Sequence, residues 1–379
     1  MTPSIHFRRG RALFAVAGTA AVLAAAACSS SPGSSSSGSS SGSPGSSGRS
    51  GAAVNVSSVT LNIGDQKGTG AQALLQAAGL ISKLPFKANW TDFTSGPPML
   101  QAMGSGSVDI GGVGDAPPVF AASGGEKVTI VGARTAPAAA AAIVVKKNSP
   151  ITSISQLKGK KIAVSQGSSA DYHLLTVLNK AGLTTKQVTL DYLQPADALA
   201  AFNSGHVDAW DVWSPYIEQA VGQDNARILV NGDGFGAPYS FQVASNAALA
   251  DQTKAAAIHD YLKILNQAYA WSGRHIAAWA KLWGDATGLP SSIMTQAAKD
   301  DVNQPVTITP TVVSAEQGLV TAFYHAGLIP DSVKMSDYMV STYNDTVSAS
   351  TASSSGAGSS DAGSSNAGSS SAGSSSAGS

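Results

Sequence analysis

Two low-complexity segments limit which part of this chain can fold. Residues 29–51 are Ser or Gly everywhere except at two prolines and one arginine, and residues 350–379 are almost entirely Ser, Gly and Ala. Such segments cannot bury apolar surface and behave as flexible coil. We therefore expect a disordered tether at 29–56 and a disordered tail at 347–379. The folded core between them, 57–346, is long enough for one large domain or two ordinary ones.

The first 28 residues have the pattern of an export signal. Three arginines precede an uncharged, mostly apolar run at 12–27, and this run ends at Cys28, the single cysteine of the chain. Small residues before a cysteine predict a lipoprotein-type signal peptide at 1–28, with Cys28 carrying a lipid at the extracytoplasmic face of the membrane. A membrane span is the alternative, although the run is short for one. The paired arginines also leave a twin-arginine export signal open.

Composition excludes several kinds of partner and site. Lys and Arg total 23, Asp and Glu total 23, and no basic patch stands out, so we expect no nucleic acid partner. One cysteine permits neither an internal disulfide nor a thiolate-rich metal site, and the six histidines lack metal-ligand spacing. We therefore expect no metal and no cofactor.

Strand patterns alternate with helix patterns through the first part of the core. Val59, Leu61 and Ile63 alternate with polar residues ahead of a Gly-rich loop. Further strands are predicted at 86–93, 108–112, 160–165, 188–193 and 207–212, and helices at 71–82, 97–103, 169–182 and 196–202. The remainder, from about 251 to 328, is mostly helical. Strands that alternate with helices predict an α/β architecture.

A near-repeat divides the core into two similar halves. The sequence SGSVD at Ser105–Asp109 recurs as SGHVD at Ser204–Asp208, and the sequence AGL at 78–80 recurs at 181–183. Two similar α/β lobes that face each other would form a cleft, and ligand sites favour such clefts. The alternative is a duplication inside one closed domain, with no site between the halves.

Four stretches resemble one known family. They are GDQKGTG (64–70), FTSGPPMLQAMGSGSVDIGGVGDAPPVFA (93–121), ISQLKGKKIAVSQGSSADYHLLTVLNKAGL (154–183) and YLQPADALAAFNSGHVDAWDVWSPY (192–216). Together they resemble the aliphatic-sulfonate, taurine and nitrate group of ABC-transporter substrate-binding proteins, and most closely its SsuA-like members. The resemblance implies a type II periplasmic-binding-protein fold, in which two α/β lobes joined by two crossing strands close on a small anion. Lobe 1 would be 57–136 with 243–346, and lobe 2 would be 137–242.

The resemblance also implies a function. A monomeric, lipid-anchored binding protein would capture a small organosulfonate-like anion and deliver it to an ABC permease and its ATPase. Nitrate, taurine, a sulfate ester, an aromatic acid or a pyrimidine are alternative ligands. The sequence shows few motifs of enzymes, so we expect no enzyme. An extracytoplasmic enzyme of the same fold and a sensor are the rival functions.

The most distinctive candidate site is the sequence SQGSS at 165–169, between a predicted strand and a predicted helix. A helix N-terminus offers unpaired N–H groups and the positive end of a dipole, which suit an anion. We expect Gln166, Ser168 and Ser169 to contact the ligand, and a few such bonds could hold a sulfonate without a buried arginine. The alternative is an ordinary N-cap, with Asp171 three residues after Ser168.

Asp171 distinguishes two classes of ligand. SsuA-like members tend to have His or a similar residue at this position. A carboxylate near an anion is costly unless it meets a cation. Asp171 therefore favours a ligand that carries an amine, or it points to solvent.

Two further loops are candidates in lobe 1. The Gly-rich loop at 64–70 supplies Gln66, Lys67 and Gly68 as possible contacts, and a simple turn is the alternative. Gly114 and Asp115 precede a predicted helix start with Asp115 as its N-cap, and we expect its backbone N–H groups to face the cleft. Pure capping is the alternative there.

Aromatic residues are candidates for covering an alkyl group of the ligand. Strand alternation places Trp210 with Val212 on one face, and Asp211 with Trp213 on the other. The resemblance places this segment at the cleft, so Trp210 and Trp213 are both candidates, with core packing as the alternative. Tyr239 at the expected return crossing is a further candidate.

Overall fold

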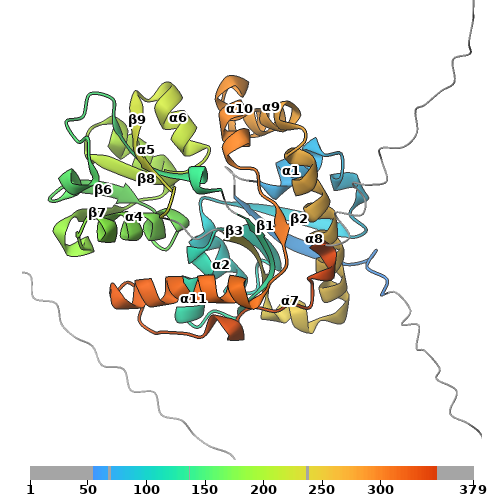
Figure 1. The fold of residues 1–379 in the computed structure, drawn as a ribbon. Helices are drawn as coiled ribbons and strands as arrows, with labels where there is room; N and C mark the ends of the chain where they lie inside the picture. Colours follow the sequence, from blue (N-terminus) through green and yellow to red (C-terminus); the bar gives the residue numbers. More distant parts are fainter. Residues whose placement is uncertain (1–53, 67–69, 136, 236–238, 348–379) are drawn as a thin grey trace, which may run out of the picture. The chain divides into compact units, whose positions relative to one another are not determined.

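Two β-sheets, sheet A and sheet B, organise the protein in the computed structural model, which describes residues 54–66, 70–135, 137–235 and 239–347 (Figure 1). Cys28, Lys67 and Gly68, with the expected signal peptide, most of the tether and nearly all of the tail, lie outside the described residues. The α/β architecture predicted from the alternating pattern is confirmed.

Sheet A has the strand order β11–β4–β10–β3–β1–β2. Its strands β1, β2 and β3 are parallel, whereas β10 runs antiparallel to β3 and β4, and β11 runs antiparallel to β4. The bounds are β1 Thr60–Gln66, β2 Lys87–Phe93, β3 Ile110–Val113, β4 Val128–Thr135, β10 Tyr239–Ser245 and β11 Pro305–Val306.

Sheet B has the strand order β7–β6–β8–β5–β9. Here β6, β7 and β8 are parallel, and β5 runs antiparallel to β8 and β9. The bounds are β5 Ala141–Lys146, β6 Lys161–Val164, β7 Thr189–Tyr192, β8 Ala209–Trp213 and β9 Ala226–Asn231. The chain therefore leaves sheet A after β4, builds sheet B, and returns to sheet A at β10.

Helices cover both sheets (Figure 1). Those with sheet B are α4 Ser169–Lys180, α5 Pro195–Asn203 and α6 Tyr216–Gln223. The others are α1 Ala71–Ala77, α2 Gly96–Gly104, α3 Ala116–Ser123, α7 Asn246–Ala250, α8 Gln252–Ser272, α9 Ile276–Thr287, α10 Ser291–Asp300 and α11 Pro310–His325. Short 3₁₀ turns lie at Ile81–Lys83, Ala138–Ala140, Ile154–Leu157, Thr185–Gln187 and Met335–Asp337. The predicted helix at 71–82 ends early because Gly79 has a φ of 65°, which continues no right-handed helix.

Strand alternation divides the apolar residues between the two faces of each sheet. In β5, Ile143 and Val145 pack with α4, whereas Ala142 and Val144 pack with α5 and α6. In sheet A, one core lies against α1, α8, α9 and α10, and another lies against α2, α3 and α11. Burial of both faces explains why these strands are rich in Val, Ile and Ala.

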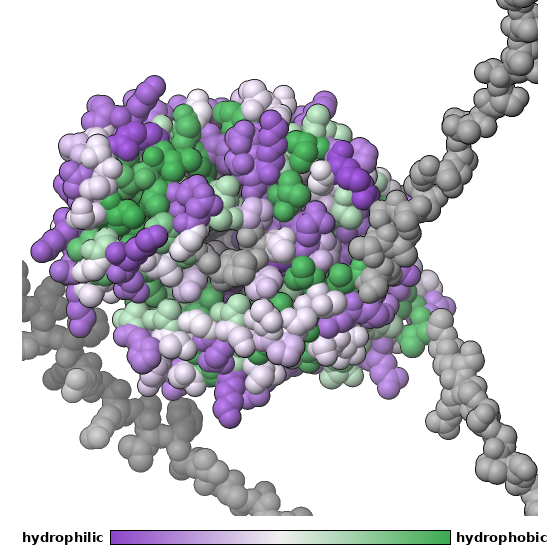
Figure 2. All heavy atoms as spheres, in the orientation of Figure 1, coloured by the Kyte–Doolittle hydropathy of each residue, from purple (hydrophilic) through white to green (hydrophobic). Residues whose placement is uncertain are grey.

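The surface carries few large hydrophobic side chains. Among the described residues, those that are exposed are Val54, Tyr192, Val221, Ile228 and Tyr324. On the face in Figure 2, hydrophobic residues gather over the strands of sheet B and the helices that cover it. Val221 of α6 and Ile228 of β9 belong to this half of the protein. In the described part of the chain, no helix combines the length and hydropathy that a membrane crossing requires.

The near-repeat has the same structural role in both halves. Asp109 Oδ2 accepts a hydrogen bond of 2.9 Å from Asn62 N–H in β1, and Asp208 Oδ2 accepts one of 2.9 Å from Lys161 N–H in β6. Each aspartate thus holds the start of a neighbouring parallel strand. The two aspartates differ in burial. Asp109 is buried and also pairs with Lys254 at 2.8 Å, whereas Asp208 is exposed.

The difference in burial predicts that removal of Asp109 and removal of Asp208 have different effects on stability. Asp109→Ala should lower the free energy of unfolding by about 1–3 kcal/mol, because it leaves a part-buried N–H group without its acceptor and breaks an ion pair of a buried carboxylate. Asp208→Ala is the matched control and should cost less than about 1 kcal/mol, since water replaces the exposed carboxylate. Urea unfolding of both variants tests the prediction. Equal losses would show that burial does not separate the two copies.

Candidate ligand-binding site

A cavity of about 140 Å³ is lined by residues from the elements of both sheets. This volume is well below the roughly 300–1,000 Å³ of sites for drug-sized molecules, so the cavity suits a small ligand. The elements of sheet A contribute Gln66, Gly96, Val113, Gly114, Asp115, Pro117, Arg134, Tyr239, Ser240, Tyr269, Asp301 and Asn303. The crossing and sheet B contribute Pro137, Ala138, Ala140, Ala141, Ser168, Ser169, His173, Trp213, Ser214 and Gly232.

The loop before α4 is held by its own side chains. Ser168 Oγ donates to Ser165 O at 2.6 Å, and Asp171 Oδ2 accepts from Gly167 N–H at 2.9 Å. Gly167 has a φ of 69°, which favours glycine. At the first turn of α4, the N–H groups of Ser169 and Ala170 have no acceptor among the described residues. The helix start therefore keeps backbone donors available for an anion.

Asp171 does not have the orientation expected from the sequence. It neither faces the cavity nor points to solvent, because it is 2% exposed and its carboxylate holds the loop through Gly167. Burial raises the pKa of Asp171 to about 7, against the lowering effect of the Gly167 bond. Asp171 lies outside the cavity lining, so it gives no reason to expect an amine on the ligand.

Ser169 connects the elements of the two sheets. Its Oγ accepts a hydrogen bond of 3.2 Å from Asp115 N–H, which precedes α3. A Cβ at position 114 would collide with the same Oγ, so this contact requires Gly114. Because the hydroxyl oxygen accepts this bond, its proton is available to donate into the cavity.

The start of α3 offers fewer donors than we expected. Asp115 N–H is committed to Ser169, and Ala116 N–H donates to Asp115 Oδ1 at 2.8 Å. Pro117 and Pro118 have no N–H group. The donors at the start of this helix are therefore engaged by Ser169 and by Asp115 itself, and contact of its backbone N–H groups with a ligand stays a prediction.

Arg134 of β4 is a cavity residue that the sequence reasoning missed. Its Nε and Nη1 atoms are buried and have no hydrogen-bond partner among the described residues, and its guanidinium carbon lies 5.0 Å from the centre of the Tyr269 ring. Leaving buried charged donors unpaired is costly, so this arginine is suited to an anion. The one available signal was a lone charge in the apolar segment VTIVGART.

Asp301 and Asn303 follow α10 and also line the cavity without having been predicted. Asn303 Nδ2 donates to Asp301 Oδ1 at 2.9 Å. Burial raises the pKa of Asp301 to about 6, while the bond from Asn303 and the charge of Arg134 lower it. This wall of the cavity therefore carries charges of both signs.

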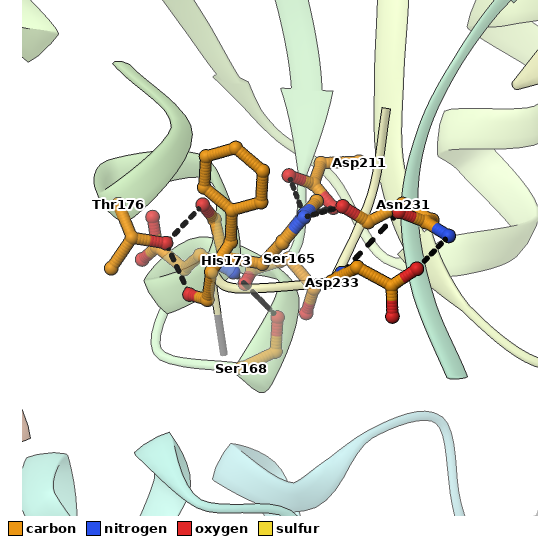
Figure 3. A network of polar contacts seen from close by, with 9 residues as sticks. Ser165, Ser168, His173, Thr176, Asp211, Asn231 and Asp233 are labelled. Atoms are coloured by element: carbon orange, nitrogen blue, oxygen red, sulfur yellow. Dashed lines mark hydrogen bonds and ion pairs between the residues drawn. The ribbon is translucent and has the colours of Figure 1, made fainter. Parts of the chain in front are cut away.

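His173 forms a buried polar network behind the start of α4 (Figure 3). Its Nδ1 lies 2.9 Å from Asp211 Oδ2, and its Nε2 lies 3.2 Å from Asn231 O. Asn231 O can only accept, so Nε2 donates to it, and a proton lies between Nδ1 and the Asp211 carboxylate, which favours the charged ring. Burial works against that charge, but Asp211 beside the ring holds the pKa of His173 above its ordinary value. The network joins α4, β8 and β9 and places the His173–Asp211 pair, whose charges compensate each other, beside the cavity.

The predicted site residues that the structure describes include some that line the cavity and some that do not. Those that line the cavity are Gln66, Gly114, Asp115, Ser168, Ser169, Trp213 and Tyr239. Gln166 is exposed outside the lining, and Trp210 is buried in the core between Phe202 and Tyr216, on the strand face opposite Trp213. Contacts of these residues with a ligand remain a prediction.

The chain is similar to known proteins. Residues 95–275 match the family model described as NMT1/THI5 like. A protein of Escherichia coli (strain K12) named as an aliphatic sulfonates-binding protein is 35% identical over 286 residues, which cover 74% of this chain and 88% of the relative.

Two solved structures are also similar. The alkanesulfonate-binding protein SsuA from Xanthomonas axonopodis pv. citri, bound to MOPS, has a TM-score of 0.71 and 32% identity over 75% of this chain and 99% of its own. The periplasmic aliphatic sulphonate binding protein SsuA from Escherichia coli has a TM-score of 0.66 and 33% identity over 74% of this chain and 92% of its own.

The two sheets, linked twice by the chain and lining one cavity, define a periplasmic-binding-protein fold, as the resemblance implied. The chain belongs to the SsuA-like family of ABC-transporter substrate-binding proteins.

The His173 network makes a prediction about pH. A histidine whose pKa is raised by folding stabilises the protein fully below its unfolded value of about 6.5, and this contribution is lost as the pH rises through the folded value. His173→Gln should therefore cost about 3–5 kcal/mol at pH 6, as expected for breaking a buried pair, and less at pH 9.

Urea unfolding at both pH values measures the loss. His206→Gln is the control, because this side chain is exposed and should show little change at either pH. A loss in His173→Gln that does not vary with pH would contradict the charged network.

Proposed function

We propose that this protein is a lipid-anchored binding protein outside the cytoplasm that captures a small organosulfonate and delivers it to an ABC permease and its ATPase. The main observation is that the buried Nε and Nη1 atoms of Arg134 have no hydrogen-bond partner among the described residues, and that Arg134 lines the same cavity as the start of α4. The names of the related proteins support sulfonates as the ligand class. The alternative ligands are nitrate, taurine, a sulfate ester, an aromatic acid and a pyrimidine.

The donor set of the cavity matches a sulfonate head. This group has three acceptor oxygens and stays charged at any physiological pH, so it needs donors from several directions. Ser169 offers its N–H and its hydroxyl, and Arg134 offers a charged fork. Each hydrogen bond to a charged group contributes about 1.5–3 kcal/mol.

Aromatic residues provide the apolar part of the proposed site. Trp213, Tyr239 and Tyr269 line the cavity beside the polar groups. Rings of this kind cover an alkyl chain at little cost in entropy, because they have few rotatable bonds. The MOPS molecule in the Xanthomonas structure is a propanesulfonate with a morpholine ring, which supports a sulfonate with an organic tail.

Capture would proceed by closure of two lobes, 57–136 with 243–346 and 137–242. Contacts between the elements of the two sheets support this proposal. Besides the Asp115–Ser169 bond, Thr94 Oγ1 and Ser95 Oγ each donate to Gln194 Oε1 at 2.9 Å. A ligand that contacts both walls would stabilise the closed form. We propose that a monomer in this form docks on the permease.

The binding site is tested by calorimetric titration with ethanesulfonate, propanesulfonate, taurine, nitrate and sulfate. The wild type should bind at least one sulfonate more tightly than the inorganic anions. Ser169→Ala should weaken that binding about ten- to a hundredfold, because a donor to the charged head is lost. Ser204→Ala, an exposed serine in the second copy of the repeat, is the control and should bind as the wild type does. Unchanged affinity in Ser169→Ala would contradict this site.

The lipid anchor is a separate prediction, since Cys28 lies outside the described residues. Cys28→Ser removes the single thiol that could be acylated, so the protein should move from the membrane fraction to the medium. Fractionation followed by a high-salt wash measures the change. A variant that stays on washed membranes would show that the protein is held there by other means.

A further inference from the structure

The side chains before two equivalent helices bond to each other rather than to their own helices. Helices α2 and α5 each precede a copy of the near-repeat. Their N-cap residues, Ser95 and Gln194, are separated by 99 residues, which is also the spacing of the two copies. Neither side chain caps its own helix. Instead, Ser95 Oγ donates to Gln194 Oε1 at 2.9 Å, so this bond joins equivalent positions of the two halves.

Prolines explain why the Ser95 hydroxyl is used in this way. An N-cap serine normally accepts from the N–H group of the second or third helical residue. In α2 these residues are Pro97 and Pro98, which have no N–H group. Ser95 is fully buried, so loss of its bond to Gln194 would leave a buried hydroxyl unsatisfied until the two halves part and water reaches it. The bond therefore favours the form in which the two helix starts lie together.

Gln194 also connects this contact with the proposed anion site. Its Oε1 accepts a second bond of 2.9 Å, from Thr94 Oγ1, and two bonds use both lone pairs of a carbonyl oxygen. Its Nε2 donates to Ser165 Oγ at 3.5 Å, and Ser165 O accepts from Ser168 Oγ at 2.6 Å. A chain of hydrogen bonds thus runs from the start of α2 to the loop before α4.

We infer that Gln194 is a positioning residue for ligand capture, which holds the closed form through Thr94 and Ser95 and so sets the rate of ligand release. Gln194 itself lies outside the cavity lining, whereas Gly96 and Ser168, at the two ends of its contacts, line the cavity. The inference rests on the proposed function, because it concerns closure of the two lobes on a sulfonate. The competing role for Gln194 is local, as a donor that holds Ser165 within lobe 2.

The test measures binding of propane-1-sulfonate to the full chain by stopped-flow tryptophan fluorescence, which Trp213 in the cavity lining should report. Gln194→Met keeps the length of the side chain and removes its acceptor and its donor. It should raise the release rate about ten- to a hundredfold, because two hydrogen bonds of the closed form are lost, and leave the association rate nearly unchanged. Gln223→Met, at the exposed end of α6, is the control and should release as the wild type does.

Substitutions on the opposite side separate the two roles of Gln194. Thr94→Val combined with Ser95→Ala removes both hydroxyl donors and keeps the contact of Gln194 with Ser165. This double variant should release the ligand about as fast as Gln194→Met, and adding Gln194→Met to it should change the rate little further. Wild-type release in the double variant, with the full effect of Gln194→Met in either background, would show a local role and overturn the inference.

The remaining outcomes separate this inference from the proposed function. Release from Gln194→Met at the wild-type rate overturns the inference and leaves the proposed function intact, because binding is still observed. A wild type that binds neither propane-1-sulfonate nor ethanesulfonate overturns the proposed function, and this inference with it. Urea unfolding establishes that each variant is folded, and the double variant decides the question alone should Gln194→Met not fold.

Discussion

The buried guanidinium of Arg134 is the group on which the account of the cavity depends. Its Nε and Nη1 atoms have no acceptor among the described residues, although burial of charged donors without partners is among the most costly arrangements in a protein. An anion in the cavity would remove that cost. A bound anion that accepts from these donors should therefore stabilise the fold by mass action.

A second set of residues stabilises the loop and the helix of the site and is not proposed to contact the ligand. Asp171 fixes the loop before α4 through Gly167, and the pair of His173 and Asp211 ties α4 to β8. These bonds leave the first N–H groups of α4 free, which is the arrangement that an anion needs. These roles explain why the Asp171 carboxylate can lie so close to the proposed anion site. The carboxylate is buried, and it accepts a hydrogen bond from the Gly167 N–H group.

Much of the fold could be predicted from local sequence because its determinants are local. Alternation in β8 predicted that Trp210 and Trp213 point to opposite faces, and of the two candidates Trp213 lines the cavity. Glycines with positive φ end the helices of both repeats. The Gly- and Ser-rich loop before α4 likewise brought Ser168 and Ser169 to the cavity. Asp171 could not be placed, because its inward turn depends on the conformation of Gly167 rather than on the spacing of residues.

Arg134 and Asp301 show what sequence reasoning could not reach. They are far apart in the chain, and they meet at one wall only because β11 pairs with β4 after α10 has ended. Neither residue lies in a motif, and β11 is too short to predict. Side chains that enter a site from different segments become visible only when tertiary structure places them together.

The central claim is that an organosulfonate binds between the two sheets with its head at Arg134 and the start of α4. The most direct measurement is a crystal structure with 2-bromoethanesulfonate, whose bromine is located by anomalous scattering. The account predicts the sulfonate within hydrogen-bond distance of Arg134 and Ser169, with the bromine toward the aromatic wall. Bromine found elsewhere on the protein, with the cavity free of ligand at saturating concentration, would contradict it.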